Sequence, residues 1–214
     1  MGQERHRRSL LVAALLGIAV SASSQSLCQK ATAGNLALLL PLVLDADLTA
    51  GAECASAISR SGGPAADALL DALLAQYGGG QEAALEHLLR ISVQTRIDGG
   101  TRPSPAILDG LAARYYSLRD ESLRFSTLSL LATSSRHRSL VLAEGNRIAT
   151  KMELSGGRLS PAATRSVTAV LAAARLSGDP ALAAVGIRLL ELTADPAVHD
   201  SVRDALDEIL RASE

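Results

Sequence analysis

One block of the chain, residues 64–77, carries its apolar residues at the spacing of a single helix face. The apolar positions are 66, 69, 70, 73, 74 and 77, which follow the i, i+3, i+4, i+7 pattern of an amphipathic helix. Similar spacing recurs in four further blocks, 81–91, 105–116, 161–175 and 196–211. No stretch of strand length alternates apolar and polar residues with period two. We therefore predict an all-α fold.

The kind of apolar residue supports the same prediction. Hydrophobic residues make up 48% of the 214 residues, so the composition is not that of a disordered chain. Ala and Leu dominate, and they lead the helix propensity ranking, whereas strands favour aromatic and β-branched residues. The aromatic residues are Tyr77, Tyr115, Tyr116 and Phe125.

Capping signals divide the chain into short helices. Ser or Asp stands directly before Pro at four places, 104–105, 160–161, 179–180 and 195–196. The side-chain oxygen can cap free backbone N–H groups, and Pro suits the first helical turn because its missing donor costs nothing there. Glycines at 62–63, 78–80, 99–100 and 156–157 follow apolar blocks, as left-handed C-caps do.

The block 118–131 differs from the others. Its Leu residues and Phe125 are spread around the whole circumference of a helix. A helix that is apolar on all sides is buried on all sides. We therefore expect this block in the middle of the structure.

The C-terminal segment 179–210 resembles a HEAT-type helical repeat. Asp–Pro opens each of its two helices 16 residues apart, small residues stand in mid-helix, and Leu residues line one face. The resemblance implies helical hairpins stacked as a short right-handed α-solenoid that presents a protein-binding surface, and it implies no catalytic residues. We expect a single helical-repeat domain over residues 33–213, with an irregular helix bundle as the structural alternative.

Residues 1–22 have the pattern of a cleavable secretory signal peptide. Arg5, Arg7 and Arg8 precede an apolar run of 11 residues, and small residues at 20 and 22 fit a cleavage site. A cut after Ser24 is also compatible. An uncleaved anchor is the alternative, but 11 residues at ~1.5 Å each cannot cross a ~30 Å hydrocarbon core. We predict a periplasmic or secreted protein without stable membrane insertion after cleavage.

Two further features lie near the start of the mature chain. The apolar run 36–44 contains Pro41 and is predicted to be a core helix that is kinked or begins there. Cys28 and Cys54 are predicted to form a disulfide, because exported chains meet an oxidising compartment. Lipidation of Cys28 and two free buried thiols remain open, although Leu27 before Cys28 does not fit a lipidation motif.

Motifs for catalysis or cofactor binding are not found. No His-Glu-x-x-His, Cys-x-x-Cys or phosphate-binding Gly-Lys-Ser/Thr motif is present. We therefore expect no metal and no cofactor. The charge is nearly balanced, with 21 Lys and Arg against 22 Asp and Glu, which gives no electrostatic reason to bind nucleic acid. The one basic concentration, Arg136, His137 and Arg138, is either a partner-binding patch or a solvated turn.

These features together favour a protein that binds rather than reacts. We expect an exported helical-repeat protein that serves as a scaffold or adaptor in the cell envelope, is not an enzyme, and binds another envelope or secreted protein. The alternatives are a structural envelope protein that self-associates and an enzyme of unrecognised type.

Overall fold

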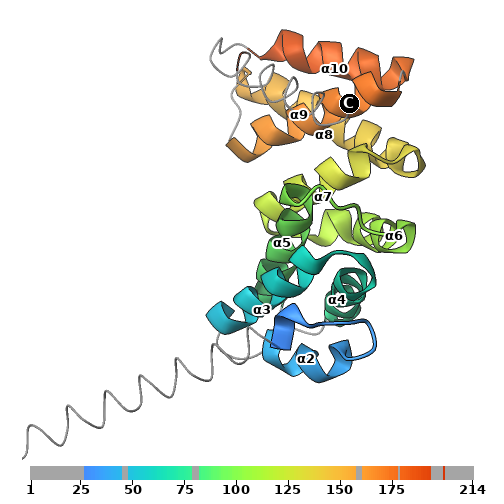
Figure 1. The fold of residues 1–214 in the computed structure, drawn as a ribbon. Helices are drawn as coiled ribbons and strands as arrows, with labels where there is room; N and C mark the ends of the chain where they lie inside the picture. Colours follow the sequence, from blue (N-terminus) through green and yellow to red (C-terminus); the bar gives the residue numbers. More distant parts are fainter. Residues whose placement is uncertain are drawn as a thin grey trace, which may run out of the picture. The chain divides into compact units, whose positions relative to one another are not determined.

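The computed structural model describes residues 27–44, 48–78, 82–157, 161–177, 179–193 and 200, and the elements of these residues are helices and turns without strands (Figure 1). The all-α prediction is confirmed. The chain divides into two compact units, Met1–Ser104 and Pro105–Glu214. A single domain over 33–213 stays a prediction. The predicted signal peptide, the helix block 196–211 apart from residue 200, and its Asp–Pro start lie outside the described residues.

The first unit contains the helices α2 (Leu36–Val43), α3 (Leu48–Ser61), α4 (Gly63–Gln76) and α5 (Glu82–Asp98). Helix α3 packs against the other three, and α4 also packs against α5. The predicted stripe of α4 is buried at Ala66, Leu69, Leu70, Leu73 and Leu74. Neighbouring helices therefore bury one another's apolar faces, which is compatible with a helical repeat.

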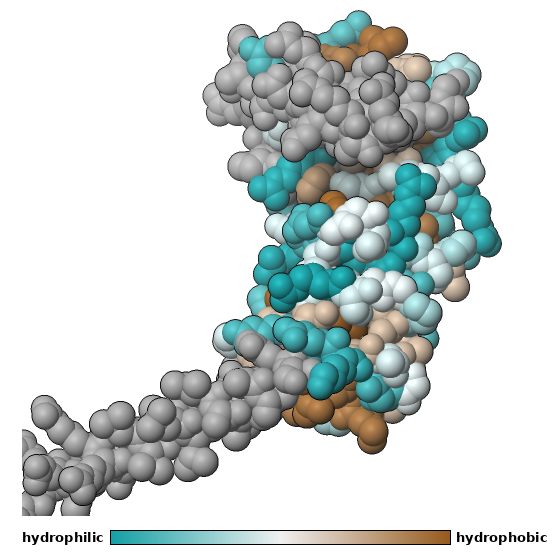
Figure 2. Space-filling model, in the orientation of Figure 1, coloured by the Kyte–Doolittle hydropathy of each residue, from teal (hydrophilic) through white to brown (hydrophobic). Residues whose placement is uncertain are grey.

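Helix α2 is apolar on both sides but buries only one of them. Leu36, Leu39 and Val43 face the rest of the unit, whereas the Leu38 side of the helix is open and Leu38 itself is 79% exposed. Figure 2 shows apolar side chains gathered over this helix. Pro41 lies inside the helix, which begins five residues earlier at Leu36, so the predicted start at Pro41 is wrong. The core-helix prediction holds for the buried side.

A buried ion pair holds the segment after α5 against α4. The guanidinium of Arg96 is 2% exposed, and its Nη1 lies 2.9 Å from Oδ1 of Asp67. Its Nη2 donates to the carbonyl of Arg102 at 2.6 Å, and the N–H of Ser104 donates to Oδ2 of Asp67 at 3.0 Å. Buried charges are tolerated only when they are paired in this way. The pair therefore fixes where residues 102–104 run.

A disulfide joins Cys28 to Cys54, with their Cα atoms 5.3 Å apart. It attaches the short helical turn at residues 27–29 to the middle of α3. Both cysteines are used, so neither is a free thiol. The covalent link closes a loop of 26 residues that contains all of α2.

Reduction of this disulfide should destabilise the first unit. Closing a loop of this length restricts the unfolded chain and stabilises the folded state by about 3 kcal/mol. We expect the urea midpoint of the protein to fall when dithiothreitol is added, and the double variant C28A/C54A to show the lower midpoint in either condition. An unchanged midpoint after verified reduction would show that the link contributes nothing to stability.

The second unit contains α6 (Pro105–Arg114), the 3-10 turn η1 (Tyr115–Ser117), α7 (Glu121–Ala132), the 3-10 turn η2 (Ser135–His137), α8 (Arg138–Ser155), α9 (Pro161–Ser177) and α10 (Pro180–Leu192). Helices α8, α9 and α10 pack against one another, and α7 packs against α9.

The capping signals of the sequence locate several helix ends in this unit. Helices α6, α9 and α10 begin at the prolines predicted to open them. The side chain of Asp179 accepts a hydrogen bond from the N–H of Ala181 at 2.8 Å, as an N-cap does. Gly156 ends α8 in the left-handed conformation, with φ of 65°.

The block 118–131 is less continuous than predicted. Its helix begins only at Glu121, because Asp120 caps it by accepting from the N–H of Leu123 at 2.8 Å. Burial follows the prediction for Leu118, Leu123, Leu128, Leu130 and Leu131, whereas Phe125 is half-buried. The helix therefore buries most, but not all, of its circumference.

Glycine lets α8 approach its two neighbours closely. A methyl group at Gly145 would lie 2.7 Å from Cγ1 of Val185 on α10 and 3.0 Å from Cγ1 of Val170 on α9. Both are closer than ordinary carbon contacts of ~3.5–4.0 Å. Valine is stiff about χ1, so neither side chain can simply turn away. Small size at this position is therefore a condition for packing the three helices together.

Substitution of Gly145 by Ala should therefore destabilise the protein although Ala favours helices. Overpacking of this kind costs about 1–3 kcal/mol. The matched control is Gly186→Ala in α10, where the new methyl group would meet the end of the flexible Leu171 side chain at 3.0 Å. We expect a clearly lower urea midpoint for G145A than for G186A. The reverse order would contradict the packing described for α8.

Candidate functional site

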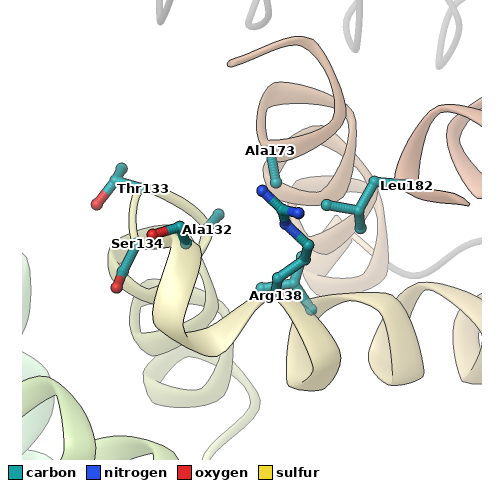
Figure 3. A pocket seen from close by; sticks show the side chains of 8 residues that line it. Ala132, Thr133, Ser134, Arg138, Ala173 and Leu182 are labelled. Atoms are coloured by element: carbon teal, nitrogen blue, oxygen red, sulfur yellow. The ribbon is translucent and has the colours of Figure 1, made fainter. Parts of the chain in front are cut away.

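The turn between α7 and α8 borders a pocket in the second unit. The pocket has a volume of about 330 Å³, at the lower end of the ~300–1,000 Å³ typical of ligand pockets. Residues from α7, the turn, α8, α9 and α10 line it (Figure 3): Ala132, Thr133, Ser134, Ser135, Arg138, Val141, Ala173 and Leu182. Its lining is therefore part polar and part apolar.

Arg138, the first residue of α8, carries the positive charge of this pocket. Its Nη1 lies 3.0 Å from Oδ2 of Asp179, whose other oxygen caps α10. Figure 3 shows the Arg138 side chain extending toward Ala173 and Leu182, with Thr133 and Ser134 on the opposite side. The N-cap bond holds Asp179 in place, so the ion pair orients the guanidinium at the pocket.

The hydroxyl groups of Thr133, Ser134 and Ser135 belong to the polar part of the pocket lining. The Thr133 hydroxyl donates to the carbonyl of Leu130 at 2.8 Å and is thereby committed to the end of α7. Ser134 precedes η2, but its side chain makes no capping bond to that turn. Ser135 is exposed. The two serines can therefore offer hydroxyl groups to a ligand without breaking a helix cap.

The structure separates the three residues of the predicted basic patch. Arg136 is 66% exposed and its Nη2 lies 3.1 Å from Oδ2 of Asp109 on α6. His137 is only 8% exposed, and its Nε2 lies 2.9 Å from Oδ1 of the same carboxylate. Arg138 pairs with Asp179 instead. Of the three, only Arg138 lines the pocket, and two carboxylates offset the positive charge of the group.

The Asp109–His137 pair resembles the orienting half of a general-base arrangement. Such a base acts only when its second nitrogen reaches a proton to be abstracted. Nδ1 of His137 is buried and has no hydrogen-bond partner among the described residues. The pair therefore ties α6 to η2 and fixes the start of α8, where Arg138 stands.

A second buried polar cluster lies beneath η1. Glu144 on α8 is 2% exposed and accepts two hydrogen bonds from Arg147, from Nε at 2.7 Å and from Nη2 at 2.6 Å. Burial raises the pKa of the Tyr115 phenol, and the charge of Glu144 and a hydrogen bond to it raise that pKa further. The ring of Tyr116 meets Tyr115 edge-on, 5.1 Å between centroids. The cluster joins η1 to α8.

Sequence reasoning missed this cluster, although a signal for it existed. Glu144 falls on the same stripe of α8 as the buried Val141, Ile148 and Met152. An acidic residue on an apolar stripe must find a buried partner. Arg147, three residues later, is within reach of it on a helix.

The first unit has a hollow of its own, of about 480 Å³, along α3. It is lined by Gln29, Thr49, Ala52, Glu53, Ser56, Ala57, Arg60 and Ile91. Gln29 follows Cys28 directly, so the disulfide holds this wall of the hollow against α3. Most of the lining side chains are small or polar.

Comparison of the chain with protein-family models, with curated proteins and with solved structures finds no match. Within the described ranges, no helix combines the length and the apolar character needed to cross a membrane. In the same ranges no three His, Cys, Asp or Glu side chains are grouped as metal ligands would be.

The Tyr115 phenol should make stability fall at high pH. In the unfolded chain it ionises near pH ~10, whereas its raised folded pKa keeps it protonated. The phenol therefore contributes fully to the free energy of unfolding below pH ~10. Above that pH the contribution decreases by about 1.4 kcal/mol per pH unit. We expect Tyr115→Phe to be less stable than the wild type at pH 8, and the difference to shrink by pH 11.

Urea unfolding at pH 8, 10 and 11 measures this difference. Tyr116→Phe is the matched control, because Tyr116 is largely exposed and its removal should change the pH dependence less. A gap between the wild type and Y115F that stays constant from pH 8 to pH 11 would contradict the buried, protonated phenol.

Proposed function

We propose that this chain is an exported helical-repeat protein that binds another envelope or secreted protein as a scaffold or adaptor, without catalysis. The observation that carries the proposal is the packing of both units. Each helix buries an apolar face against its neighbours, and among the described residues the surface carries ion pairs, hydroxyl groups and hollows beside exposed apolar side chains such as Leu38. Such arrays use their surfaces for recognition.

Two features support the finer parts of the proposal. The HEAT resemblance of 179–210 is supported in its first half, where Asp179 caps α10 and α10 packs against α8 and α9. Export is supported by the Cys28–Cys54 disulfide, because such bonds form and persist in oxidising compartments. The predicted leader 1–22 would be the signal that directs export.

Self-association is the second candidate, and the open side of α2 favours it. Leu38 is 79% exposed and α2 carries no charged residue that would repel a second copy. A repeat array normally needs a polar face wherever it is not covered by a neighbour, in order to stay soluble. Two copies stacked through α2 would satisfy the same need.

Photo-crosslinking in the native cell tests both candidates. A photoreactive residue is placed at Ser135, which lines the pocket, at Leu38 on α2, or at the exposed Lys151 on α8 as control. We expect Ser135 to capture one defined exported protein, identified by mass spectrometry, and Lys151 to capture it less. A product of twice the chain mass from Leu38 alone would favour self-association. No specific product from any position would contradict partner binding.

A further inference from the structure

We propose that the pocket at the turn between α7 and α8 binds the C-terminal carboxylate of a partner polypeptide whose last side chain is small and aliphatic. The inference rests on the proposed function, since it names the part of the partner that the second unit recognises. The observation behind it is the guanidinium of Arg138, which Asp179 orients and which lies beside the apolar residues of the lining.

The guanidinium of Arg138 has donors to spare. An arginine side chain offers five N–H donors in a planar fork that matches a carboxylate through two parallel hydrogen bonds. In the described part of the chain its ion-pair partner is Asp179, whose Oδ2 lies 3.0 Å from Nη1. Because Asp179 is also fixed by the N–H of Ala181, it positions the fork and leaves its other edge for a second carboxylate.

The rest of the lining suits the residue that carries such a carboxylate. Val141, Ala173 and Leu182 lie at the bottom of the pocket where α8, α9 and α10 meet, and each is at most 2% exposed, so the apolar area they present suits only a small side chain. Ser134 and Ser135 also belong to the lining, and Figure 3 draws Ser134 across the pocket from Arg138. A cation and apolar side chains thus line the same side of one pocket (Figure 3).

A chain end fits this arrangement better than an internal acidic residue. At a C-terminus the carboxylate and the side chain branch from the same Cα, so both can enter a pocket whose cation lies next to its apolar floor. An internal Asp or Glu carries its carboxylate on its only side chain and needs room for the main chain to enter and leave.

Nuclear magnetic resonance titration of the mature, disulfide-bonded protein tests the inference with three probe peptides. They are acetyl-Gly-Gly-Val with a free carboxylate, the same peptide as its amide, and acetyl-Gly-Asp-Gly amide. We expect the free carboxylate to shift the backbone signals of Ser134, Ser135, Arg138 and Leu182. Its affinity should exceed that of both amides by at least about tenfold, because a charge-assisted hydrogen-bonded pair is lost in one and misplaced in the other.

Two variants assign the carboxylate to its partner. Arg138→Gln should weaken binding of the free peptide by at least about tenfold, and Arg138→Lys should weaken it less, because Lys keeps the charge but loses the fork. Arg136→Gln is the matched control. It also removes one positive charge, but Arg136 lies two residues before Arg138 and its side chain does not line the pocket. The affinity of R136Q for the free-carboxylate peptide should match that of the wild type within about twofold.

Three results overturn the inference: equal affinity for the carboxylate and amide peptides, equal affinity for the internal Asp peptide, or equal losses in R136Q and R138Q. The first two comparisons use the wild type and do not depend on how a variant folds. A partner that crosslinks at Ser135 without any carboxylate-dependent peptide binding leaves the proposed function standing and removes this inference. Carboxylate-dependent binding without a crosslinked partner supports this inference and counts against the proposed function.

Discussion

The close packing of small and aliphatic side chains between neighbouring helices holds this protein together. No helix here can bury its apolar face alone, and with few aromatic residues the chain fills its core with Leu, Val and Ala. The contact at Gly145 shows how tight the fit is, since a single methyl group would press on valines of two other helices. Dense interiors of this kind tolerate little change in volume. The positions of the turns and hollows follow from which faces are buried.

Buried polar groups then determine how the connecting segments run. Asp67 and Arg96 hold residues 102–104 in the first unit, and Glu144 holds Tyr115 and Arg147 in the second. Removing one partner from a buried pair is strongly destabilising, because an uncompensated charge is then left in the core. The Asp109–His137 pair belongs to the same group. It fixes the start of α8, and so the guanidinium at the pocket stands where Asp179 can orient it.

Local signals in the sequence predicted much of the fold. Stripe spacing predicted the buried face of α4, and Asp179 with Pro180 predicted the start and cap of α10, because both depend on residues within one or two turns. The burial of His137 was not predictable in this way. Its partner Asp109 lies 28 residues away, and only the packing of α6 against the turn brings the two together.

In the candidate site, too, features set by neighbouring residues were predictable, whereas features set by the packing of distant helices were not. Arg138 was visible as part of a basic run, but the pocket was not, because its lining also includes Ala173 and Leu182 from two later helices. The sequence did not show that Arg136 and His137 pair with Asp109 whereas Arg138 pairs with Asp179, because both carboxylates are distant in the chain. Glu144 lies on the apolar stripe of α8 three residues before Arg147, so its buried ion pair was predictable from helical spacing alone.

The Cys28–Cys54 link connects the packing of the first unit with the proposed export, since an exported chain can keep a disulfide that a cytosolic one would lose. Intact-mass and disulfide mapping of the protein recovered from its native cell tests this connection most directly. We predict a chain that begins just after Ala22 or Ser24, lies in the envelope or the medium, and has Cys28 bonded to Cys54. A cytosolic chain that retains Met1 and carries two free thiols would contradict export, and with it the proposed partner outside the cytosol.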